Sequence, residues 1–102
     1  MPVITLTSDW GTKDHYLASV KGSILRHIPE ARIIDISHSI EPHNLSQAAF
    51  ILKNCYHDFP EGSVHIIGVN TEESEQHPHT AVKAGGQYFI GADNGIFNLL
   101  FE

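Results

Sequence analysis

Short apolar runs alternate with segments of helical periodicity along the first seventy residues. Residues 3–7, 32–36 and 64–69 are rich in Val and Ile, which is typical of strands buried on both faces of a sheet. Residues 14–28 instead place apolar side chains three or four positions apart, which predicts an amphipathic helix with one apolar stripe. The members of this stripe are Leu17, Val20, Ile24, Leu25 and Ile28.

A second helix is expected after Pro42 and Asn44, where apolar side chains recur at helical spacing. Its predicted apolar face comprises Ala48, Ala49, Leu52, Cys55 and Tyr56. Two further β-rich runs, 80–84 and 87–91, are separated by two consecutive glycines. A Gly-Gly pair between two such runs is typical of a β-hairpin turn.

The order strand-helix-strand-helix-strand-hairpin predicts an α/β fold. We expect a three-layer α/β/α domain with a mainly parallel sheet and a C-terminal hairpin. Ligands of such sheets bind outside the carboxyl ends of the strands. Polar segments follow the three predicted parallel strands, with the sequences SDWGTKD, SHSIEPHN and NTEESEQHPH. The sequence therefore places a candidate binding site at this edge of the sheet.

Length and composition narrow the class of protein. The 102 residues, 41% of them hydrophobic and 18% charged, are enough for one domain with one core. The net charge of −6 argues against a nucleic-acid-binding surface, which needs clustered basic residues. We expect no membrane association, because no apolar run is long enough to span a bilayer and the first residues do not form a signal peptide. Because the only cysteine cannot form an internal disulfide, we expect a cytoplasmic protein.

Two carboxylates, Asp9 and Asp14, flank the turn after the first strand. A carboxylate there can bind the two vicinal hydroxyls of a ribose, or it can ligate Mg²⁺. Alternatively, Thr12 or Asp14 caps the first helix and Asp9 supports the turn. Trp10, between the two acids, is either a core side chain or a ring on which a base stacks.

Eight histidines raise the question of a metal site. None of them forms an H-x-x-x-H or H-E-x-x-H pattern, and the cysteine has no C-x-x-C partner. His77 and His79 could chelate a metal weakly, but we expect the histidines to be solvated loop residues. No metal site is predicted. The ADNG segment at 92–95 is expected to form a turn.

Five stretches in the same order along the chain resemble one known family. They are ITLTSDWGTKDHYLASVKG, RIIDISHSIEPHN, AAFIL, FPEGSVH and AGGQYFIGADNGIF. Together they resemble the N-terminal domain of the S-adenosyl-L-methionine (SAM) hydroxide adenosyltransferases. These are adenosine-forming SAM hydrolases related to the fluorinating and chlorinating enzymes. The resemblance covers almost the whole chain, which we assign to one such domain, residues 1–102.

The resemblance implies a reaction and a set of substrate-binding residues. Water or hydroxide attacks ribose C5′ of SAM, methionine leaves and adenosine forms, with SAM as substrate and without a cofactor or a metal. Asp9 then binds the ribose hydroxyls, and Asp14 is a second acid of the site. The remaining positions that match the family's nucleoside site are His43, Asn44, Asp93 and Asn94.

The third polar segment departs from the family pattern. Family hydrolases typically read D-P-G-V-G and then Arg there, and the Asp and Arg handle the attacking water. This chain carries Asn70 and, near the Arg position, His77. Asn lacks the charge with which Asp polarises water. We interpret Asn70 and His77 as the divergent catalytic positions.

The resemblance also implies a C-terminal domain and a trimer, because family sites form between neighbouring subunits. We therefore expect residues 1–102 to be a fragment that is inactive alone. Two alternatives remain: a non-catalytic module that binds adenosine or SAM, and a Mg²⁺-dependent phosphoryl-transfer or hydrolase domain using the two acids.

Overall fold

The computed structural model describes residues 3–42, 44–69, 79–92 and 95–101. Within these residues the chain forms one five-stranded sheet with helices on both faces. The strands are β1 (Val3–Ser8), β2 (Arg32–Ser37), β3 (Val64–Gly68), β4 (His79–Ala84) and β5 (Gln87–Ala92). The helices are α1 (Tyr16–His27), α2 (Leu45–Lys53) and α3 (Ile96–Leu100), with a 3₁₀ turn, η1 (Tyr56–Asp58).

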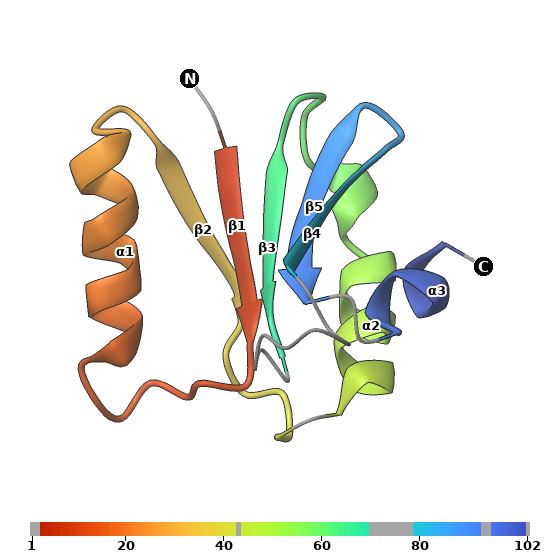
Figure 1. Ribbon diagram of the computed structural model, residues 1–102, viewed down its shortest axis with the longest axis horizontal. Helices are drawn as coiled ribbons and strands as arrows, with labels where there is room; N and C mark the ends of the chain where they lie inside the picture. The colour runs from red at the N-terminus through yellow and green to blue at the C-terminus, as the bar shows by residue number, and fades with distance from the viewer. Residues whose placement is uncertain (1–2, 43, 70–78, 93–94, 102) are drawn as a thin grey trace.

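The sheet is parallel except at one edge. Its strand order is β2-β1-β3-β5-β4, and only β4 runs antiparallel to its neighbour β5. Helix α1 covers one face, and α2 with α3 covers the other (Figure 1). The predicted α/β fold, with its mainly parallel sheet and C-terminal hairpin, is confirmed. Because β1, β2, β3 and β5 are parallel, their carboxyl ends meet at one edge, which is the lower edge in Figure 1.

The hydrophobic core lies between the sheet and the α2/α3 layer. Leu52 of α2 and Phe89 of β5 are almost completely buried there. The other buried members of this cluster are Ile40, Ala48, Ala49, Ile67, Val69, Ile96 and Leu100. Helices α2 and α3 on one face of the sheet thus enclose the described core, and burial of apolar area is the main source of folding free energy.

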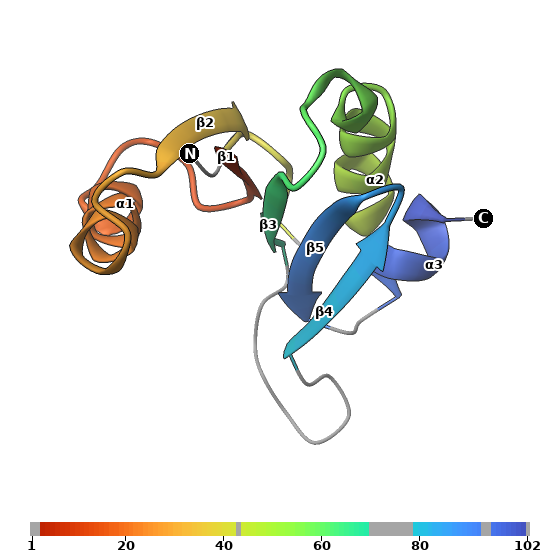
Figure 2. The ribbon, with the colours of Figure 1, turned by 90° about the horizontal axis from the view of Figure 1, so that it is seen from above.

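Helix α1 packs far more loosely against the opposite face. None of its residues is buried, and Leu25 of the predicted apolar stripe is 42% exposed. Between α1 and the sheet lies a groove of about 510 Å³, and Val20, Ile24 and Ile66 are among the side chains that line it. Viewed from above, α1 stands at one end of the sheet, beside β2 and β1, and leaves β5 uncovered on its side (Figure 2). The apolar stripe of α1 is thus only partly covered by the sheet, and Leu25 is its exposed member.

Helix α2 ends earlier than its apolar pattern predicts. Cys55 and Tyr56 lie beyond it, because the helix stops at Lys53 and the chain enters η1. The Asn54 side chain donates to the Phe50 carbonyl over 2.6 Å. The same carbonyl also accepts the Asn54 N–H over 3.3 Å, so the side chain adds a second donor to a carbonyl of the last turn.

No helix among the described residues is long and apolar enough to cross a membrane.

Candidate functional site

The segment after β1 is held by its backbone at the carboxyl edge of the sheet. Three consecutive N–H groups are satisfied there. Asp9 N–H donates to the Gly68 carbonyl at the end of β3 over 3.3 Å, and Gly11 N–H donates to the His38 carbonyl over 2.9 Å. Between them, Trp10 N–H donates to Ser8 Oγ over 3.3 Å. These bonds fix the position of the backbone that carries the first acid.

Gly11 allows this segment to turn. Its φ of 74° lies in the left-handed region, which glycine adopts without the steric penalty of a side chain. The turn sends the chain from the end of β1 toward the start of α1 along the edge of the sheet. The predicted location of Asp9 and Trp10, at the carboxyl end of β1, is therefore observed.

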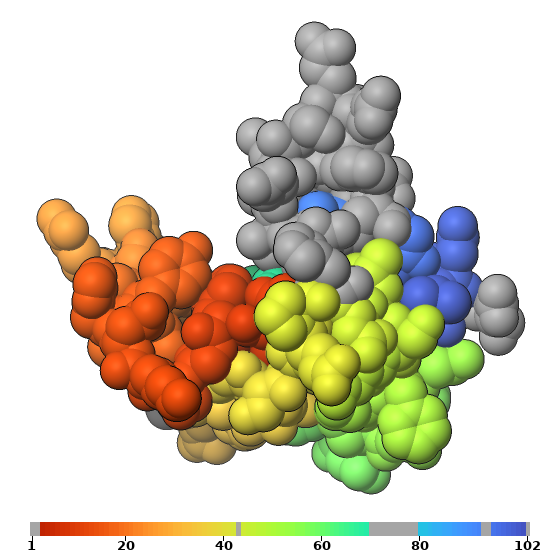
Figure 3. Space-filling model, turned by 90° about the horizontal axis from the view of Figure 1, so that it is seen from below, coloured from red at the N-terminus to blue at the C-terminus, as the bar shows by residue number. Residues whose placement is uncertain are grey.

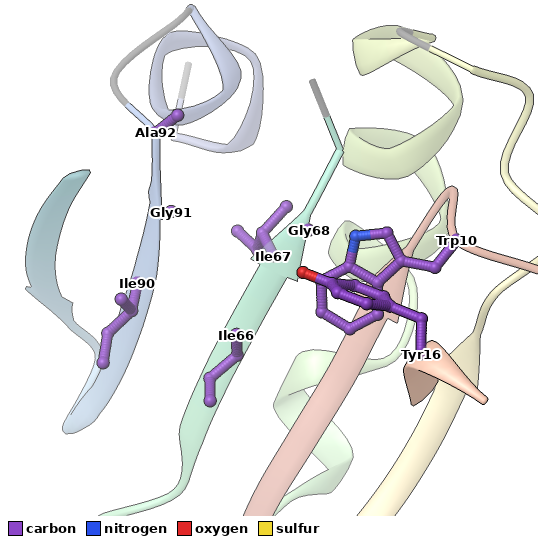
Figure 4. A pocket seen from close by; sticks show the side chains of 8 residues that line it. All are labelled: Trp10, Tyr16, Ile66, Ile67, Gly68, Ile90, Gly91 and Ala92. Carbon is purple, nitrogen blue, oxygen red and sulfur yellow. The ribbon is translucent and has the colours of Figure 1, made fainter. Parts of the chain in front are cut away.

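Trp10 lies over Gly68 and beside an open cavity. The cavity has a volume of about 260 Å³ and is lined on one side by Trp10 and Tyr16, whose rings meet edge to face with centroids 5.1 Å apart. Its other side is formed by Ile66, Ile67 and Gly68 of β3 and by Ile90, Gly91 and Ala92 of β5 (Figure 4). Trp10 is thus neither a core side chain nor a fully exposed ring, and one wall of an apolar pocket is aromatic.

Asp14 contacts the first turn of α1. Its Oδ1 accepts the N–H of Tyr16 over 3.0 Å, and its side chain is exposed. Helix α1 begins after His15, whose own side chain makes no cap hydrogen bond. Of the two candidate caps, Asp14 therefore supports the helix start, and this contact favours the capping alternative for this acid.

The segment between β2 and α2 lies beside the segment after β1. Figure 3 shows the two segments, in orange-red and yellow, next to each other on the face at the carboxyl ends of the strands. The Gly11–His38 hydrogen bond joins them. At the end of the second segment, Asn44 caps α2, because its Oδ1 accepts the Gln47 N–H over 3.0 Å. Asn44 has a structural role at this position whether or not it also contacts a ligand.

A hydrogen-bonded chain runs through His38. Its Nδ1 bonds to Ser8 Oγ over 2.5 Å, and its Nε2 lies 2.8 Å from Asp35 Oδ1. Asp35 Oδ2 in turn accepts from Lys21 Nζ of α1 over 2.5 Å. Partial burial opposes ionisation of Asp35, but the hydrogen bonds from Lys21 and His38 outweigh it and hold the pKa of this carboxyl below its usual value.

Two histidines differ from the expected solvated loop residues. His38 is 6% exposed and His65 is fully buried in β3. The Thr5 hydroxyl lies 2.6 Å from His65 Nδ1, and Gln87 Oε1 bonds to Nε2. Burial lowers the pKa of His65, partly opposed by the hydrogen bond to Gln87. The sequence does contain one indication, because His65 occupies an inward position of a predicted buried strand.

Several predicted site residues lie outside the described residues. They are His43, Asn70, His77, Asp93 and Asn94. Conversely, sequence reasoning missed three described residues of the site: Ser8, Tyr16 and Gly68. No sequence pattern marks Gly68 as a site residue, because its role depends on the Trp10 ring that lies against it in the fold. In the part of the chain that the structure describes, no group of three or more His, Cys, Asp or Glu side chains could hold a metal ion.

The fold and this edge define an open α/β domain whose candidate ligand site combines an acid, an aromatic wall and backbone-fixed turns. A family model for the SAM hydroxide adenosyltransferase N-terminal domain matches residues 4–102. The chain belongs to this family.

Curated relatives agree with the family match. The (R)-S-adenosyl-L-methionine hydrolase of Methanocaldococcus jannaschii is 37% identical over 107 residues, covering 100% of this chain and 40% of the relative. The hydrolase of the same name from Thermus thermophilus is 33% identical, covering 97% of this chain and 38% of the relative. A fluorinase of Actinopolyspora mzabensis is 35% identical over 63 residues, covering 62% of this chain and 21% of the relative.

Solved structures share the fold. The crystal structure of an uncharacterized conserved protein from Thermotoga maritima has a TM-score of 0.88 at 35% identity, covering 95% of this chain and 37% of that chain. The chain spans about two fifths of the length of the hydrolases it matches.

Proposed function

We propose that this chain is the N-terminal part of an enzyme that cleaves SAM to adenosine and L-methionine. The oxygen of water or hydroxide forms a bond to ribose C5′, the C5′–S bond breaks, and its electron pair stays on sulfur. The sulfonium thereby becomes the neutral thioether of methionine, and the proton lost by water goes to solvent. The names of the relatives support this reaction.

One observation carries the proposal for the site. Asp9 directly follows β1 at the carboxyl edge, and its backbone N–H is anchored to Gly68. In an open α/β sheet this is the edge where ligands bind, and an acid there can accept hydrogen bonds from both ribose hydroxyls. The Trp10–Tyr16 wall supplies an apolar surface for the ring systems of the same ligand. We therefore assign Asp9 to the ribose and Trp10 to the nucleoside.

The other assignments rest on the family resemblance. His43, Asn44, Asp93 and Asn94 bind the nucleoside. The resemblance also makes Asp14 the second acid of the site, whereas its hydrogen bond from the Tyr16 N–H favours capping. The longer protein assembles as a trimer in the cytoplasm and uses SAM without a metal or a cofactor.

A second function is favoured by the sequence after β3. With Asn70 and His77 in place of Asp and Arg, the side chains that would orient and polarise the attacking water are changed. A protein that binds adenosine or SAM without cleaving it is consistent with these substitutions, and it needs the same ribose contact at Asp9.

Calorimetric titration with adenosine and SAM tests the ribose assignment. Asp9→Ala is expected to weaken binding about tenfold to a hundredfold, because hydrogen bonds to a charged group contribute roughly 1.5–3 kcal/mol. Asp58→Ala is the matched control, since it removes an exposed acid from η1, away from the carboxyl edge. Equal affinities of wild type and Asp9→Ala would refute the assignment. Release of adenosine by the longer protein then separates cleavage from binding alone.

A further inference from the structure

Two of the three N–H groups that anchor the segment after β1 involve His38, one through its backbone carbonyl and one through its ring. His38 accepts the Gly11 N–H through its carbonyl and bonds through its ring to Ser8, whose hydroxyl accepts the Trp10 N–H. The imidazole also stacks on the Trp10 indole, with an interplanar angle of 14° and centroids 6.1 Å apart. His38 thus contacts every residue of the turn that follows Asp9.

The partners of His38 determine the direction of each hydrogen bond. A carboxylate only accepts, so His38 Nε2 carries the hydrogen and donates to Asp35. In the neutral imidazole, Nδ1 is then an acceptor and takes the Ser8 O–H. Ser8 Oγ keeps its lone pairs for the Trp10 N–H. Every donor in this hydrogen-bond network therefore has an acceptor. Lys21 forms the last bond of the network, at the surface.

The order Ser8–His38–Asp35 has the composition of a nucleophilic triad, but its geometry excludes that role. Ser8 is fully buried, and its oxygen already bonds to Trp10 N–H and to His38. A nucleophile has to reach the reacting carbon of a substrate. This hydrogen-bond network therefore holds the turn in place and does not react with a substrate.

We propose that His38 is a positioning residue that holds the Asp9–Gly11 turn, and with it the ribose-binding acid, in the ligand-binding geometry. Asp35 fixes the tautomer and orientation of His38, because its carboxylate accepts the hydrogen of Nε2 and leaves Nδ1 to accept from Ser8. This role rests on the proposed function of Asp9. It requires no contact between His38 and the ligand.

The chain offers a built-in reporter of this turn. Trp10 is the only tryptophan in the 102 residues, so the tryptophan fluorescence of this chain comes from the residue that His38 stacks on. The test compares wild type, His38→Leu, His38→Asn and Asp9→Ala by fluorescence titration with adenosine and by amide hydrogen exchange. The matched control is His57→Leu, the same change at an exposed histidine in η1.

His38→Leu is expected to weaken adenosine binding about tenfold, as for the loss of roughly one hydrogen bond that orders the site. The Trp10 amide should exchange faster, because the Ser8 hydroxyl that accepts its N–H loses its ring partner. Gly11, which bonds to the backbone carbonyl of residue 38, and Ile66 in β3 should keep their protection. His38→Asn should recover part of the affinity, because an amide oxygen can take the acceptor place of Nδ1. His57→Leu should bind as wild type does. A merely structural role would lower stability without this local pattern.

Three outcomes separate the possibilities. Wild-type affinity in His38→Leu, with binding lost in Asp9→Ala, would overturn the positioning role and leave the proposed function intact. If wild type binds neither adenosine nor SAM, the proposed function fails, and unchanged exchange at Trp10 in His38→Leu would overturn the positioning role as well. If His38→Leu does not fold, Asp35→Ala replaces it. That variant keeps the ring but removes its orienting partner, and unchanged exchange and affinity would be decisive against the proposal.

Discussion

A methyl group on Gly68 would lie 2.3 Å from Cζ2 of the Trp10 ring. Two further ring atoms, Cε2 and Cη2, would lie within 3.0 Å of it. Non-bonded carbon atoms pack at about 3.5–4.0 Å and repel strongly at much shorter distances. The indole and a side chain at position 68 therefore cannot both occupy these positions. The end of β3 and the turn after β1 are therefore in contact at the one place where the strand has no side chain.

Gly68→Ala is expected to displace the indole. The folded protein should lose about 1–3 kcal/mol of unfolding free energy, as for other overpacked sites, and the Trp10 emission should shift to longer wavelength. Urea unfolding followed by fluorescence measures both effects. The control is Gly22→Ala in α1, where an added Cβ meets nothing within 4 Å and stability should not fall. Unchanged emission in Gly68→Ala would contradict the observed contact.

The buried imidazole of β3 predicts a pH dependence of stability. The pKa of His65 is lowered in the folded state, so between its ordinary value of 6.5 and the folded value only the unfolded chain binds the proton. The unfolding free energy should therefore be constant above about pH 7 and fall as the pH drops below 6.5. The limiting slope for one group is about 1.4 kcal/mol per pH unit.

Chemical unfolding at about pH 7.5 and at about pH 5.5, roughly one unit above and one unit below the ordinary histidine pKa, measures this slope. The comparison variant is His65→Gln, which removes the titrating group and keeps polar atoms near Thr5 and Gln87. Its stability should depend less on pH than that of wild type. Equal pH dependence in the two proteins would show that His65 is not responsible.

Asn44 allows capping and ligand binding to be separated. Asn44→Ala should destabilise the domain by about 1 kcal/mol, because it removes the acceptor of the Gln47 N–H. Asn44→Asp keeps an acceptor at the N-cap and should retain stability, but it replaces the amide N–H₂ by a charged oxygen. Thermal unfolding and adenosine titration of both variants give the answer. A binding loss in Asn44→Asp with unchanged stability indicates a ligand contact, whereas wild-type binding in that variant rules out a contact that needs the amide.

Residues 1–102 alone are expected not to release adenosine from SAM. Asn70 and His77 stand at the positions where the family resemblance implies the Asp and Arg that handle water, and loss of general-base help costs about a hundredfold or more in rate. Chromatography after incubation with SAM measures adenosine directly, with the Methanocaldococcus jannaschii hydrolase as the positive control. Adenosine above the protein-free level, abolished by Asp9→Ala, would show that this third segment still supports catalysis.

The sheet and its hairpin were predictable because their determinants are local. Buried parallel strands need apolar runs, and the sequence has them at β1 and β3. Strand β2 is recognisable from a similar run, although it lies at the edge of the sheet and has no buried residue. The hairpin turn needs two residues with positive φ, and Gly85 and Gly86 have φ of 59° and 76°. Each of these features can be recognised within a few consecutive residues.

The surroundings of the two buried histidines were not predictable in this way. His38 bonds to a serine thirty residues away, and His65 bonds to a threonine sixty residues away. A histidine is solvated or buried according to whether such partners are present, and these partners meet only after the strands have paired. For the same reason Asp14 remained ambiguous in sequence, and its contact with the Tyr16 N–H was needed to favour capping.

The unequal packing of the two helical layers has a consequence for how the molecule opens. Helix α1 buries no residue, and its ion pair with Asp35 is exposed and weakened by salt. Its detachment therefore costs only a fraction of the free energy of global unfolding, whereas α2 cannot leave without exposing Leu52 and the core around it. In native-state proteolysis, trypsin should cleave at Lys21 and Arg26 before it cleaves at Lys53. The residues that lead from Asp9 into α1 thus belong to a cooperative unit that is less stable than the α2/α3 layer.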